Sequence, residues 1–536
     1  MCCRRRKSAP RAAGPSVAPL VLARPVSARL RALIALAAGA ALTTSFAPLA
    51  LWPLAVLCPA VLMWLWQDAT PRESAWLGFL FNAGTFSAGT YWLLLSLPLG
   101  GAPIWLALLL LLGLTGIMAL YHAVLGYACA RWLPRSGAVR SLVALPAAWL
   151  LVEWWRGWFL SGFSWLSLGY SQTDTWLAGL APVAGVYGVS AALLLIAGAL
   201  LTLVSGSGRA RAVAVVVLLV PWGAGAALHG VSWTHASGGP VSVAIAQGAV
   251  PQDEKWLDAN KQATLDLYQK LTEQAFGNAL IVWPESATAA MANDIVPWLT
   301  NIYRDAHAHG SALVMGILRA EGGVADSDAV RSYNAVLALD DEVGWYDKHH
   351  LVPFAEYFPV PHFVRSWMRL MSLPYSDFTP GAAYQPPLEA AHLRLGTTVC
   401  YEDAYGSTML EALRRGAANA LVNVTNDAWF DHTSARHLHF QVARMRALEE
   451  GRYLIRATND GISAVIGPHG EVVARAPEFR PVVLVSQVIP LAGLTPYARV
   501  GNWLIVTLAT LALACGLWVR NDRLWRTRSG SAGAGT

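Results

Sequence analysis

Three short motifs in the second half of this 536-residue chain carry side chains that could act together in catalysis. IVWPES contains Glu285, WYDKHHLVPFAEYFP contains Lys348 and Glu356, and GTTVCYED contains Cys400 and Glu402. A carboxylate can take the proton of a thiol, and an ammonium can stabilise the oxyanion that forms when the thiolate attacks an acyl carbonyl. Glu285, Lys348 and Cys400 therefore predict covalent acyl transfer, for which no catalytic histidine is needed.

The region 238–490, which contains these motifs, has the pattern of a folded α/β domain. Charged and turn residues are frequent there, no apolar run is long enough to span a bilayer, and short apolar segments alternate with helical stretches such as DANKQATLDLYQKLTEQAF. Ligand sites in α/β sheets lie at strand ends, where the three motifs are expected to meet. The expected strands are VSVAIAQG, ALIVWPE, ALVMGIL, YNAVLALD, LRLGTTVCYE, ANALVNVTND and YLIRATNDGISAVIG.

The composition of the whole chain is that of a membrane protein. Hydrophobic residues make up 55% and charged residues only 13%, whereas soluble proteins have about 25% charged residues. The mean hydropathy is +0.42. The six cysteines have no regular spacing, which argues against a disulfide framework or a CxxC metal site. The formal charge of +6 requires no nucleic-acid partner, because most of the excess lies in the tails and short loops.

Eight apolar runs are near the length of about 20 residues that spans a bilayer. They cover 31–48, 51–67, 75–97, 104–130, 141–156, 177–204, 212–228 and 501–519. If every run crosses, the arginines of the tails and of alternate loops fall on one side, which predicts cytoplasmic termini and places the α/β domain outside the cytoplasm. The expected parts are a basic, poorly ordered N-terminus (1–28), a seven-helix region (29–230), the α/β domain (238–490), a last transmembrane helix (499–519) and a cytoplasmic tail (520–536).

The motifs resemble a known family. WPES, KHHLVPFAE and CYED are similar to motifs of the carbon-nitrogen hydrolase (nitrilase) superfamily, and an α/β domain placed between seven helices and one helix resembles the bacterial apolipoprotein N-acyltransferase family. QGAVPQDEKW, NVTNDAWF and ARMRALEEGRYLIRATNDGISAVIGPHG agree. Two positions depart from the pattern: Ala355 stands where glycine is expected before Glu356, and His349 where arginine is common.

The resemblance implies a nitrilase-like αββα sandwich attached to a membrane bundle of about eight transmembrane helices. It also implies a bacterial inner-membrane protein whose catalytic domain faces the periplasm. Cys400, deprotonated by Glu285, would attack an ester carbonyl of a phospholipid, typically phosphatidylethanolamine, while Lys348 stabilises the oxyanion. The resulting thioester would pass its acyl chain to the α-amine of the diacylglyceryl-cysteine of an apolipoprotein.

Further residues receive supporting roles from the same resemblance. Glu356 and Glu402 would orient or tune the site, and Tyr401 and Trp256 would shape the pocket. We expect a monomer without a cofactor or metal. The histidines lack an HExxH-type spacing and are expected to be solvated loop or pocket residues; they are His349, His350, His432, His437 and His439.

Simpler interpretations of these features remain open. A cysteine after a strand is more often a small buried hydrophobe than a nucleophile, although Glu285 and Lys348 reverse that preference here. Lys348 and Glu356 could form a surface ion pair. The aromatic cluster EWWRGWF at 153–159 is most simply an interfacial belt, with recognition of lipid headgroups as the alternative.

Two other classes of function also fit parts of the chain. A membrane-tethered nitrilase-like amidase or esterase would use the same three residues, with water as the acceptor. A transporter with the α/β domain as a receptor is disfavoured, because the apolar runs contain few of the ionisable residues that transport pathways use.

Overall fold

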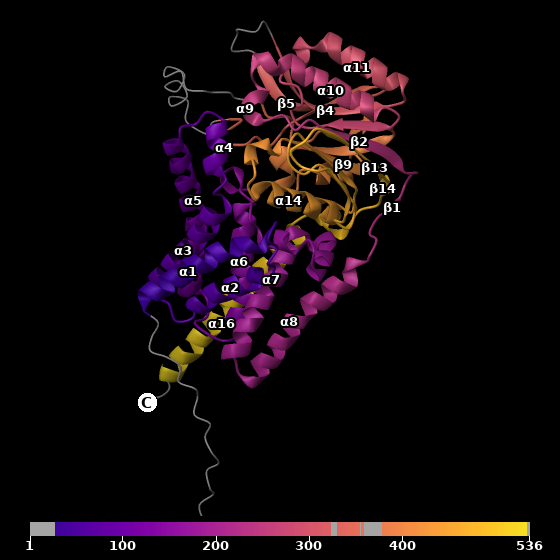
Figure 1. Ribbon diagram of the computed structural model, residues 1–536. Coiled ribbons are helices and arrows are strands. Elements are labelled where there is room, and N and C mark those ends of the chain that lie inside the picture. Colours follow the sequence, from indigo (N-terminus) through magenta and orange to yellow (C-terminus); the bar gives the residue numbers. More distant parts are fainter. Residues whose placement is uncertain (1–26, 323–329, 354, 358–377, 533–536) are drawn as a thin grey trace, which may run out of the picture.

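The computed structural model describes residues 27–322, 330–353, 355–357 and 378–532, the last twelve of these by their backbone only. Most of the expected basic N-terminus lies outside these residues. Figure 1 shows a helical part in indigo and magenta below a sheet-rich part in pink and orange. The last helix, in yellow, runs back down beside the other helices, so the sheet-rich domain is an insertion at one end of a helical bundle.

Each apolar run of the sequence corresponds to a helix or a pair of helices. Those that precede the sheet-rich domain are α1 (Ala28–Leu42), α2 (Leu54–Leu65), α3 (Pro71–Gly89), α4 (Leu93–Leu99), α5 (Ile104–Trp132), α6 (Leu145–Arg156, after a π-helical turn at Arg140–Ala144), α7 (Ala181–Ser205) and α8 (Gly208–His229). The last helix is α16 (Trp503–Ala532). The third run, expected as one helix, is broken into α3 and α4.

Among the described residues, four helical segments are long and apolar enough to cross a membrane on their own: Ile104–Trp132, Trp176–Ser205, Gly208–His229 and Trp503–Arg520. Helices α1 and α2 have 15 and 12 residues, a rise of about 22 and 18 Å, which is less than the roughly 30 Å of hydrocarbon in a bilayer. They form a hairpin whose connecting loop reaches the sheet-rich domain, where the Ala47 N–H donates to Gln441 Oε1 at 3.1 Å.

Glycines allow the first helices to pack backbone against backbone. A Cβ on Gly84 of α3 would lie 2.2 Å from the Leu36 carbonyl oxygen of α1, and one on Gly126 of α5 would lie 2.3 Å from the Ser74 carbonyl oxygen of α3. Small residues at helix crossings are typical of membrane bundles, because they let helices approach closely. These contacts explain why α1, α3 and α5 form one packed layer.

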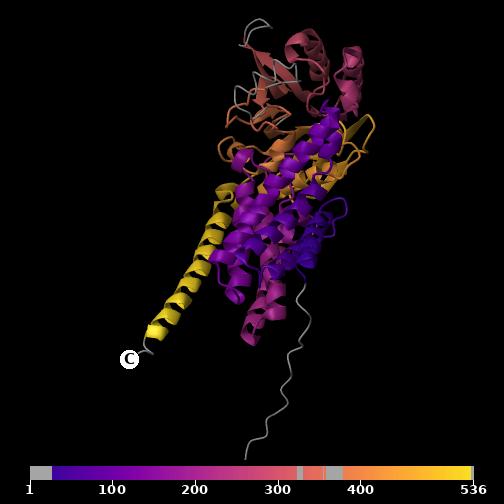
Figure 2. The same cartoon turned by 90° about the vertical axis from the view of Figure 1, so that its left-hand side faces the viewer.

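The arginine-bearing loops gather at the end of the bundle far from the sheets. Arg520 near the end of the apolar part of α16 donates to the Arg131 carbonyl oxygen at the end of α5. Arg140 donates to the carbonyl oxygens of Pro134 and Trp66 at 2.7 and 3.3 Å. Figure 2 shows α16 leading away from the sheets towards this end. The structure therefore separates the basic loops from the α/β domain along the length of the bundle.

The sheet-rich domain contains two six-stranded sheets that pack face to face. The first sheet has the order β13-β2-β3-β4-β5-β6 and the second β12-β11-β10-β9-β8-β7. In the first sheet the strands are β2 (Val241–Gln247), β3 (Leu280–Trp283), β4 (Ala312–Glu321), β5 (Arg331–Leu339), β6 (Val343–Asp347) and β13 (Val482–Val488). In the second they are β7 (Leu388–Ala390), β8 (Leu393–Val399), β9 (Ala420–Thr425), β10 (Leu454–Thr458), β11 (Ala464–Ile466) and β12 (Val472–Arg475).

Helices cover the outer face of each sheet, which completes the expected αββα sandwich. The inner faces share one core that includes Val243 and Leu280 of the first sheet and Leu395 and Val422 of the second. The first sheet is covered by α10 (Lys261–Ala275) and α11 (Val296–Ala308), and the second by α13 (Leu410–Arg414) and α14 (Ala435–Glu450). A two-residue pair, β1 (His235–Ala236) with β14 (Leu491–Ala492), joins the entry and exit of the domain.

Helix α14 lies between the second sheet and the membrane helices, and it is buried on both sides. Phe440 and Ala443 pack in the core of the sheet side, while Leu438, Val442 and Met445 belong to the core of the helical bundle. The spacing of these two sets gives a helix with two apolar faces. Consequently the α/β domain and the bundle share a continuous packed interface.

Candidate active site

The ends of three strands bring the predicted reactive groups together. Glu285 follows β3, Lys348 follows β6 and Cys400 follows β8, so the two sheets contribute to one site. Lys348 Nζ lies 3.7 Å from Glu285 Oε1, and the charges of both residues act on the Cys400 thiol. The structure thus assembles the three residues that the motifs predicted.

Two carboxylates and one amide surround the buried ammonium of Lys348. Its Nζ donates to Glu356 Oε1 at 2.9 Å. The Asn334 amide of β5 donates to Glu285 Oε1 at 2.7 Å and to Glu356 Oε1 at 2.8 Å. Burial would lower the pKa of Lys348, but Glu356 and Glu285 outweigh it and hold that pKa above its usual value. Lys348 therefore stays charged, and its partner Glu356 belongs to a buried pair instead of a surface ion pair.

Only one oxygen of Glu285 is used by these contacts. Among the described residues, the hydrogen bonds to its carboxylate go to Oε1, and Oε2 has no hydrogen-bond donor. A carboxylate oxygen without a donor can accept a proton. The geometry therefore leaves Glu285 competent as a base.

Cys400 is held in a conformation that is uncommon for residues other than glycine. Its φ is 53°, in the left-handed region, and such a conformation costs on the order of 1–3 kcal/mol. Its carbonyl oxygen accepts a hydrogen bond from Asn423 Nδ2 at 3.1 Å and lies 3.4 Å from His439 Nε2. These contacts fix the turn η8 (Cys400–Ala404) and thereby the direction of the thiol.

The surroundings of the thiol favour its protonated form. Burial raises the pKa of Cys400, the negative charges of Glu285 and Asp427 raise it further, and only Lys348 among the charged neighbours lowers it. A thiolate is the reactive form of cysteine. The thiol must therefore lose its proton to a base as it attacks, which is the role that the free oxygen of Glu285 can fill.

Glu402 ties the Lys348 loop to the Cys400 turn. Its Oε1 accepts the backbone N–H groups of His349 and His350 at 2.8 and 2.9 Å. Its Oε2 accepts the Val399 N–H at 2.8 Å and the Tyr346 hydroxyl at 3.1 Å. Four hydrogen bonds from both sheets converge on one fully buried side chain, so Glu402 sets the distance between the ammonium and the thiol.

Glu356 reaches the site although alanine precedes it. Besides Lys348 and Asn334, its carboxylate accepts the Val352 N–H at 2.8 Å. His349, the second departure from the family pattern, bonds the Gly381 carbonyl oxygen through Nδ1 at 2.7 Å. Both unusual positions are therefore accommodated within the local hydrogen bonding.

The two aromatic residues expected to shape the pocket occupy different places. Tyr401 packs against Phe163 and Trp165 from the loop after α6, with ring centroids 6.3 and 6.1 Å apart. Trp256 is half exposed at the end of α9 (Gln252–Lys255). Lys255, the neighbour of Trp256, connects this segment to the site, because the buried amine of Lys255 donates to the Glu285 carbonyl oxygen at 3.3 Å.

Lys255 and Asn334 were not singled out by the sequence. Lys255 is a second buried amine beside Glu285, and burial lowers its pKa to about 8. Asn334 lies within the apolar strand β5, where a single asparagine gives no catalytic signal. Only the position of Lys255 beside Trp256, in a segment that resembles the family, could have drawn attention to it.

The expectation that the histidines are solvated is wrong for His439. Its ring is buried, with Nδ1 2.8 Å from Asp427 Oδ1 and Nε2 3.2 Å from Asp403 Oδ1. Arg456 pairs with the same two carboxylates at 3.0 and 3.2 Å. Burial and Arg456 would lower the pKa of His439, but Asp403 and Asp427 raise it to about 9. A buried network of two acids and two cations thus supports the Cys400 turn from behind.

The site also touches the helical bundle directly. Ser164 Oγ donates to the Ala404 carbonyl oxygen at 2.9 Å, and the Tyr405 hydroxyl donates to the Ser161 carbonyl oxygen at 2.7 Å. The loop after α6 therefore supports the turn that carries Cys400. This arrangement places the Cys400 thiol at the boundary between the bundle and the α/β domain.

Within the described part of the chain, the group of side chains close enough to share a metal ion is His307, Asp340 and Asp341, none of which belongs to the triad. The chemistry that the site offers is attack by a thiol, assisted by a carboxylate and an ammonium.

Comparisons with known proteins match both the helical part and the α/β domain of the chain. Residues 38–199 match the family model described as the apolipoprotein N-acyltransferase N-terminal domain, and residues 242–498 match the carbon-nitrogen hydrolase model. The chain is 40% identical to the apolipoprotein N-acyltransferase of Methylococcus capsulatus over 475 residues, which is 88% of this chain and 92% of that protein. It is 39% identical to that of Pseudomonas putida (90% and 96% covered) and 40% identical to that of Azotobacter vinelandii (90% and 94% covered).

Proposed function

Because the chain belongs to the apolipoprotein N-acyltransferase family, we propose that it transfers a fatty acyl chain from a membrane phospholipid to an apolipoprotein through a thioester on Cys400. The acceptor is the N-terminal amine of a diacylglyceryl-cysteine. Phosphatidylethanolamine is the proposed donor. All three reacting groups come from one chain, so a monomer is sufficient for this chemistry.

In the first step the Cys400 sulfur attacks the ester carbonyl of the phospholipid. Glu285 takes the thiol proton through its free oxygen, and Lys348 stabilises the oxyanion of the tetrahedral intermediate. Collapse of the intermediate breaks the ester bond. Glu285 returns the proton to the departing oxygen, which leaves a lysophospholipid and an acyl thioester.

In the second step the amine of the acceptor attacks the thioester carbonyl. Glu285 takes a proton from the amine, Lys348 again stabilises the oxyanion, and the sulfur leaves as Cys400 regains a proton. An amide replaces the thioester. A thioester is a better acyl donor to an amine than an ester is, so the sulfur divides one difficult transfer into two easier ones.

The position of the site supports a reaction between two lipids. The turn that carries Cys400 rests on the loop after α6, through Ser164 and Tyr405, so the thiol lies next to the membrane-embedded helices. We propose that the chain resides in the bacterial inner membrane with the α/β domain in the periplasm. The clustering of arginine loops at the opposite end of the bundle supports this orientation.

The observation that carries the proposal is the convergence of Glu285, Lys348 and Cys400 at this boundary, in a chain that matches apolipoprotein N-acyltransferases over 88–90% of its length. The test is incubation of purified protein with phospholipid labelled in its acyl chains and a synthetic diacylglyceryl-cysteine peptide. We expect labelled triacylated peptide, and none with Cys400→Ala. Release of labelled fatty acid to water, with no labelled peptide, would contradict the transferase and favour a membrane-tethered esterase or amidase.

A further inference from the structure

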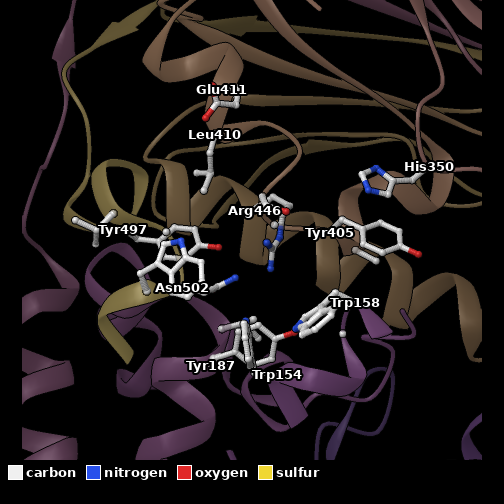
Figure 3. Close-up of a pocket in the computed structure, with 18 of the residues that line it drawn as sticks. Trp154, Trp158, Tyr187, His350, Tyr405, Leu410, Glu411, Arg446, Tyr497 and Asn502 are labelled. Atoms are coloured by element: carbon white, nitrogen blue, oxygen red, sulfur yellow. The ribbon is translucent and has the colours of Figure 1, made fainter. Parts of the chain in front are cut away.

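A cavity of about 550 Å³ lies at the junction of the bundle, the α/β domain and the start of α16. Figure 3 shows its walls: Trp154 and Trp158 from the end of α6, Tyr405 and Leu410 from the α/β domain, and Tyr497 and Asn502 from the segment that leads into α16. This volume lies within the range of small-ligand sites. None of the proposed mechanism's steps uses this space.

The cavity is separate from the reacting groups. Its lining contains neither the triad nor any of the supporting residues named from the motifs. His350 and Tyr405 form a wall towards the triad, with their rings stacked at a centroid distance of 4.3 Å. The two spaces are therefore adjacent, and a ligand in the cavity would lie beside the loop of Lys348 without touching the thiol.

A buried guanidinium points into the cavity. Arg446 of α14 is 1% exposed, and Figure 3 shows its side chain directed towards the central space. Its Nη1 lies 2.6 Å from Glu449 Oε2, and its Nη2 donates to the Tyr170 hydroxyl at 3.4 Å. Its Nε has no hydrogen-bond partner among the described residues. A Cβ at position 406 would lie 1.7 Å from Nη1. Gly406 therefore provides the space that lets the guanidinium reach the cavity.

Other polar groups of the lining are also available to a ligand. The buried Oδ1 atom of Asn502 lacks a hydrogen-bond partner within the described part of the chain. Arg414 of the lining donates through Nε to the Ala498 carbonyl oxygen at 2.6 Å, and its Nη1 lies 3.7 Å from Glu411 Oε1. Among the described residues, no hydrogen bond or ion pair involves its other terminal nitrogen, Nη2. Buried polar groups without partners are costly unless a ligand or water satisfies them. These groups point to a ligand that both accepts and donates hydrogen bonds.

The charge of the lining favours an anion. Arg414 and Arg446 of the lining contribute positive charge, and Arg415 adds a third guanidinium beside Glu411. Two carboxylates face these three cations, because Glu411 pairs with both Arg414 and Arg415, and Glu449 pairs with Arg446. The arginines therefore outnumber their acidic partners. Burial lowers the pKa of His350 to about 4, so its ring is neutral. Arginine is well suited to phosphate, because its planar group can make two parallel hydrogen bonds.

The rim of the cavity has the composition of a membrane boundary. Trp158 is 52% exposed and Trp503 is 69% exposed, and both line the cavity. Below Trp503, Leu504, Leu508 and Leu511 form an exposed stripe on one face of α16. Tryptophan gathers at the level of lipid headgroups, and leucine lies against acyl chains.

We propose that this cavity is a second lipid site, in which the phosphate of a phospholipid headgroup binds between Arg446 and Arg414 and the acyl chains lie along α16. The bound lipid would brace the junction beside the catalytic loops. Lipid binding in this cavity does not depend on the proposed acyl transfer, because a lipid can bind there without being consumed.

The test uses two photoreactive variants made in a Cys400→Ala background, so that no lipid is consumed at the thiol. p-Benzoylphenylalanine replaces Trp158 in the cavity, or Trp176 as the matched control. Trp176 is 63% exposed and does not line the cavity. Each protein is reconstituted in vesicles of phosphatidylethanolamine and phosphatidylglycerol, or of phosphate-free digalactosyldiacylglycerol. After illumination, mass spectrometry measures the lipid attached to the probe.

In vesicles of phosphatidylethanolamine and phosphatidylglycerol, we expect phospholipid to be attached to the probe at position 158. In the phosphate-free vesicles, lipid labelling at this position should fall at least tenfold. The amount of lipid attached at position 176 should differ little between the two kinds of vesicle. Arg414→Gln or Asn502→Phe should cause a similar loss at position 158 alone. Asn502→Phe fills the cavity near its partly exposed rim, so it stays informative if Arg414→Gln fails to fold.

Three results would overturn the proposal. The first is equal labelling at position 158 by both kinds of vesicle. The second is labelling by a diacylglyceryl peptide in place of phospholipid, which would assign the cavity to the acceptor. The third is a stabilising shift in Tm with inorganic phosphate in detergent while the probe at position 158 captures no lipid, which would indicate a site for free phosphate.

Discussion

Two groups of the proposed triad, Cys400 and Lys348, have pKa values that are shifted by burial and by neighbouring charges. Burial and the charges of Glu285 and Asp427 keep the Cys400 thiol protonated, while Glu356 and Glu285 keep Lys348 charged. Glu285 retains one oxygen free of hydrogen-bond donors among the described residues. These states are compatible with the proposed roles of Glu285 as base, Lys348 as oxyanion group and Cys400 as nucleophile.

Replacing the base should remove most of the acylation rate. Glu285→Gln keeps the size of the side chain and its contact with Asn334 but cannot accept the thiol proton, so thioester formation should fall by about 10²–10⁴-fold. Single-turnover acylation with labelled phospholipid measures this rate. Glu273→Gln, at an exposed position on α10, is the matched control and should acylate normally. Normal acylation of Glu285→Gln would mean that another group is the base.

Replacing Lys348 by another cation should slow acylation even though the positive charge is kept. Lys348 is buried between two carboxylates, and a guanidinium is larger, planar and not a point charge. We expect acylation of Lys348→Arg to fall at least tenfold in the same assay, with Lys270→Arg on the surface of α10 as the control. If Lys348→Arg keeps the wild-type rate, the oxyanion is stabilised elsewhere.

Protonated His439 should stabilise the fold in a definite pH window. The pKa of His439 is raised to about 9, above the value of about 6.5 for an unfolded chain. The folded state then holds a proton that the unfolded state releases. Its contribution is complete below about pH 6.5 and is lost as the pH rises through about 9.

The apparent Tm in detergent, measured from pH 6 to 10, checks this sign. The wild type should lose stability as the pH rises, and His439→Gln should be less stable at pH 6 and show a smaller loss. The comparison with the variant isolates His439 from the other groups that titrate in this range, such as Lys255. A parallel pH dependence in the two proteins would contradict a protonated His439.

At the scale of elements, one side chain connects the loop after β6 with the turn after β8. Glu402→Gln would replace an acceptor of hydrogen bonds by an amide nitrogen, leaving at least one buried N–H of His349, His350 or Val399 without a partner. Each such loss costs about 1–3 kcal/mol. We expect a lower Tm together with slower acylation of Cys400. Wild-type values of both in this variant would show that Glu402 does not set the geometry of the site.

The strands show how far the sequence could predict the fold. The expected segments correspond to strands in the middle of the two sheets, which are buried on both faces and therefore continuously apolar. Within the two six-stranded sheets, four strands were not predicted, and they are the edge strands β6, β7, β12 and β13. Strands β6, β7 and β12 have only three to five residues, so their apolar pattern is weak. Strand β13 has seven residues with the apolar sequence VVLVSQV, and the prediction missed it. The triad could be predicted because its motifs end in or beside recognisable segments.

Two supporting residues, Asn334 and His439, could not be predicted from the sequence, for a different reason. Asn334 and His439 act only through partners far away in the chain, such as Glu285 and Asp403. Their own surroundings in the sequence are ordinary for a strand and a helix. Long-range contacts of this kind become visible only when the two sheets and α14 are packed together.

At the scale of the whole molecule, the bundle, the interposed domain and the last helix form one continuous structure. Helix α14 contacts both the bundle and the α/β domain, and the loop after α6 contacts the Cys400 turn. Through these contacts the membrane bundle supports the site. The apolar runs predicted the helices, but not the break between α3 and α4 or the short lengths of α1 and α2. Neither feature is visible in hydropathy, because turns inside a packed bundle can be as apolar as the helices.

The orientation of the whole chain can be tested with a fusion. A reporter that is active only in the periplasm, placed after Ser237 at the entry of the α/β domain, should be active, because the arginine loops lie at the opposite end of the bundle. The same reporter at the C-terminus should be inactive. The reverse pattern would place the site on the cytoplasmic side and contradict the lipoprotein reaction.

The most direct test of the covalent account is an acyl label on Cys400 that can be followed into the acceptor. With labelled phospholipid and no acceptor, we expect hydroxylamine-sensitive label to accumulate on Cys400, and to leave when a diacylglyceryl-cysteine peptide is added and becomes labelled in turn. Cys400→Ala should carry no label, whereas Cys515→Ala in α16 should be labelled like the wild type. Label on the Cys400→Ala protein, or loss of the acyl group to water as fast as to the peptide, would contradict a thioester that serves as the acyl donor.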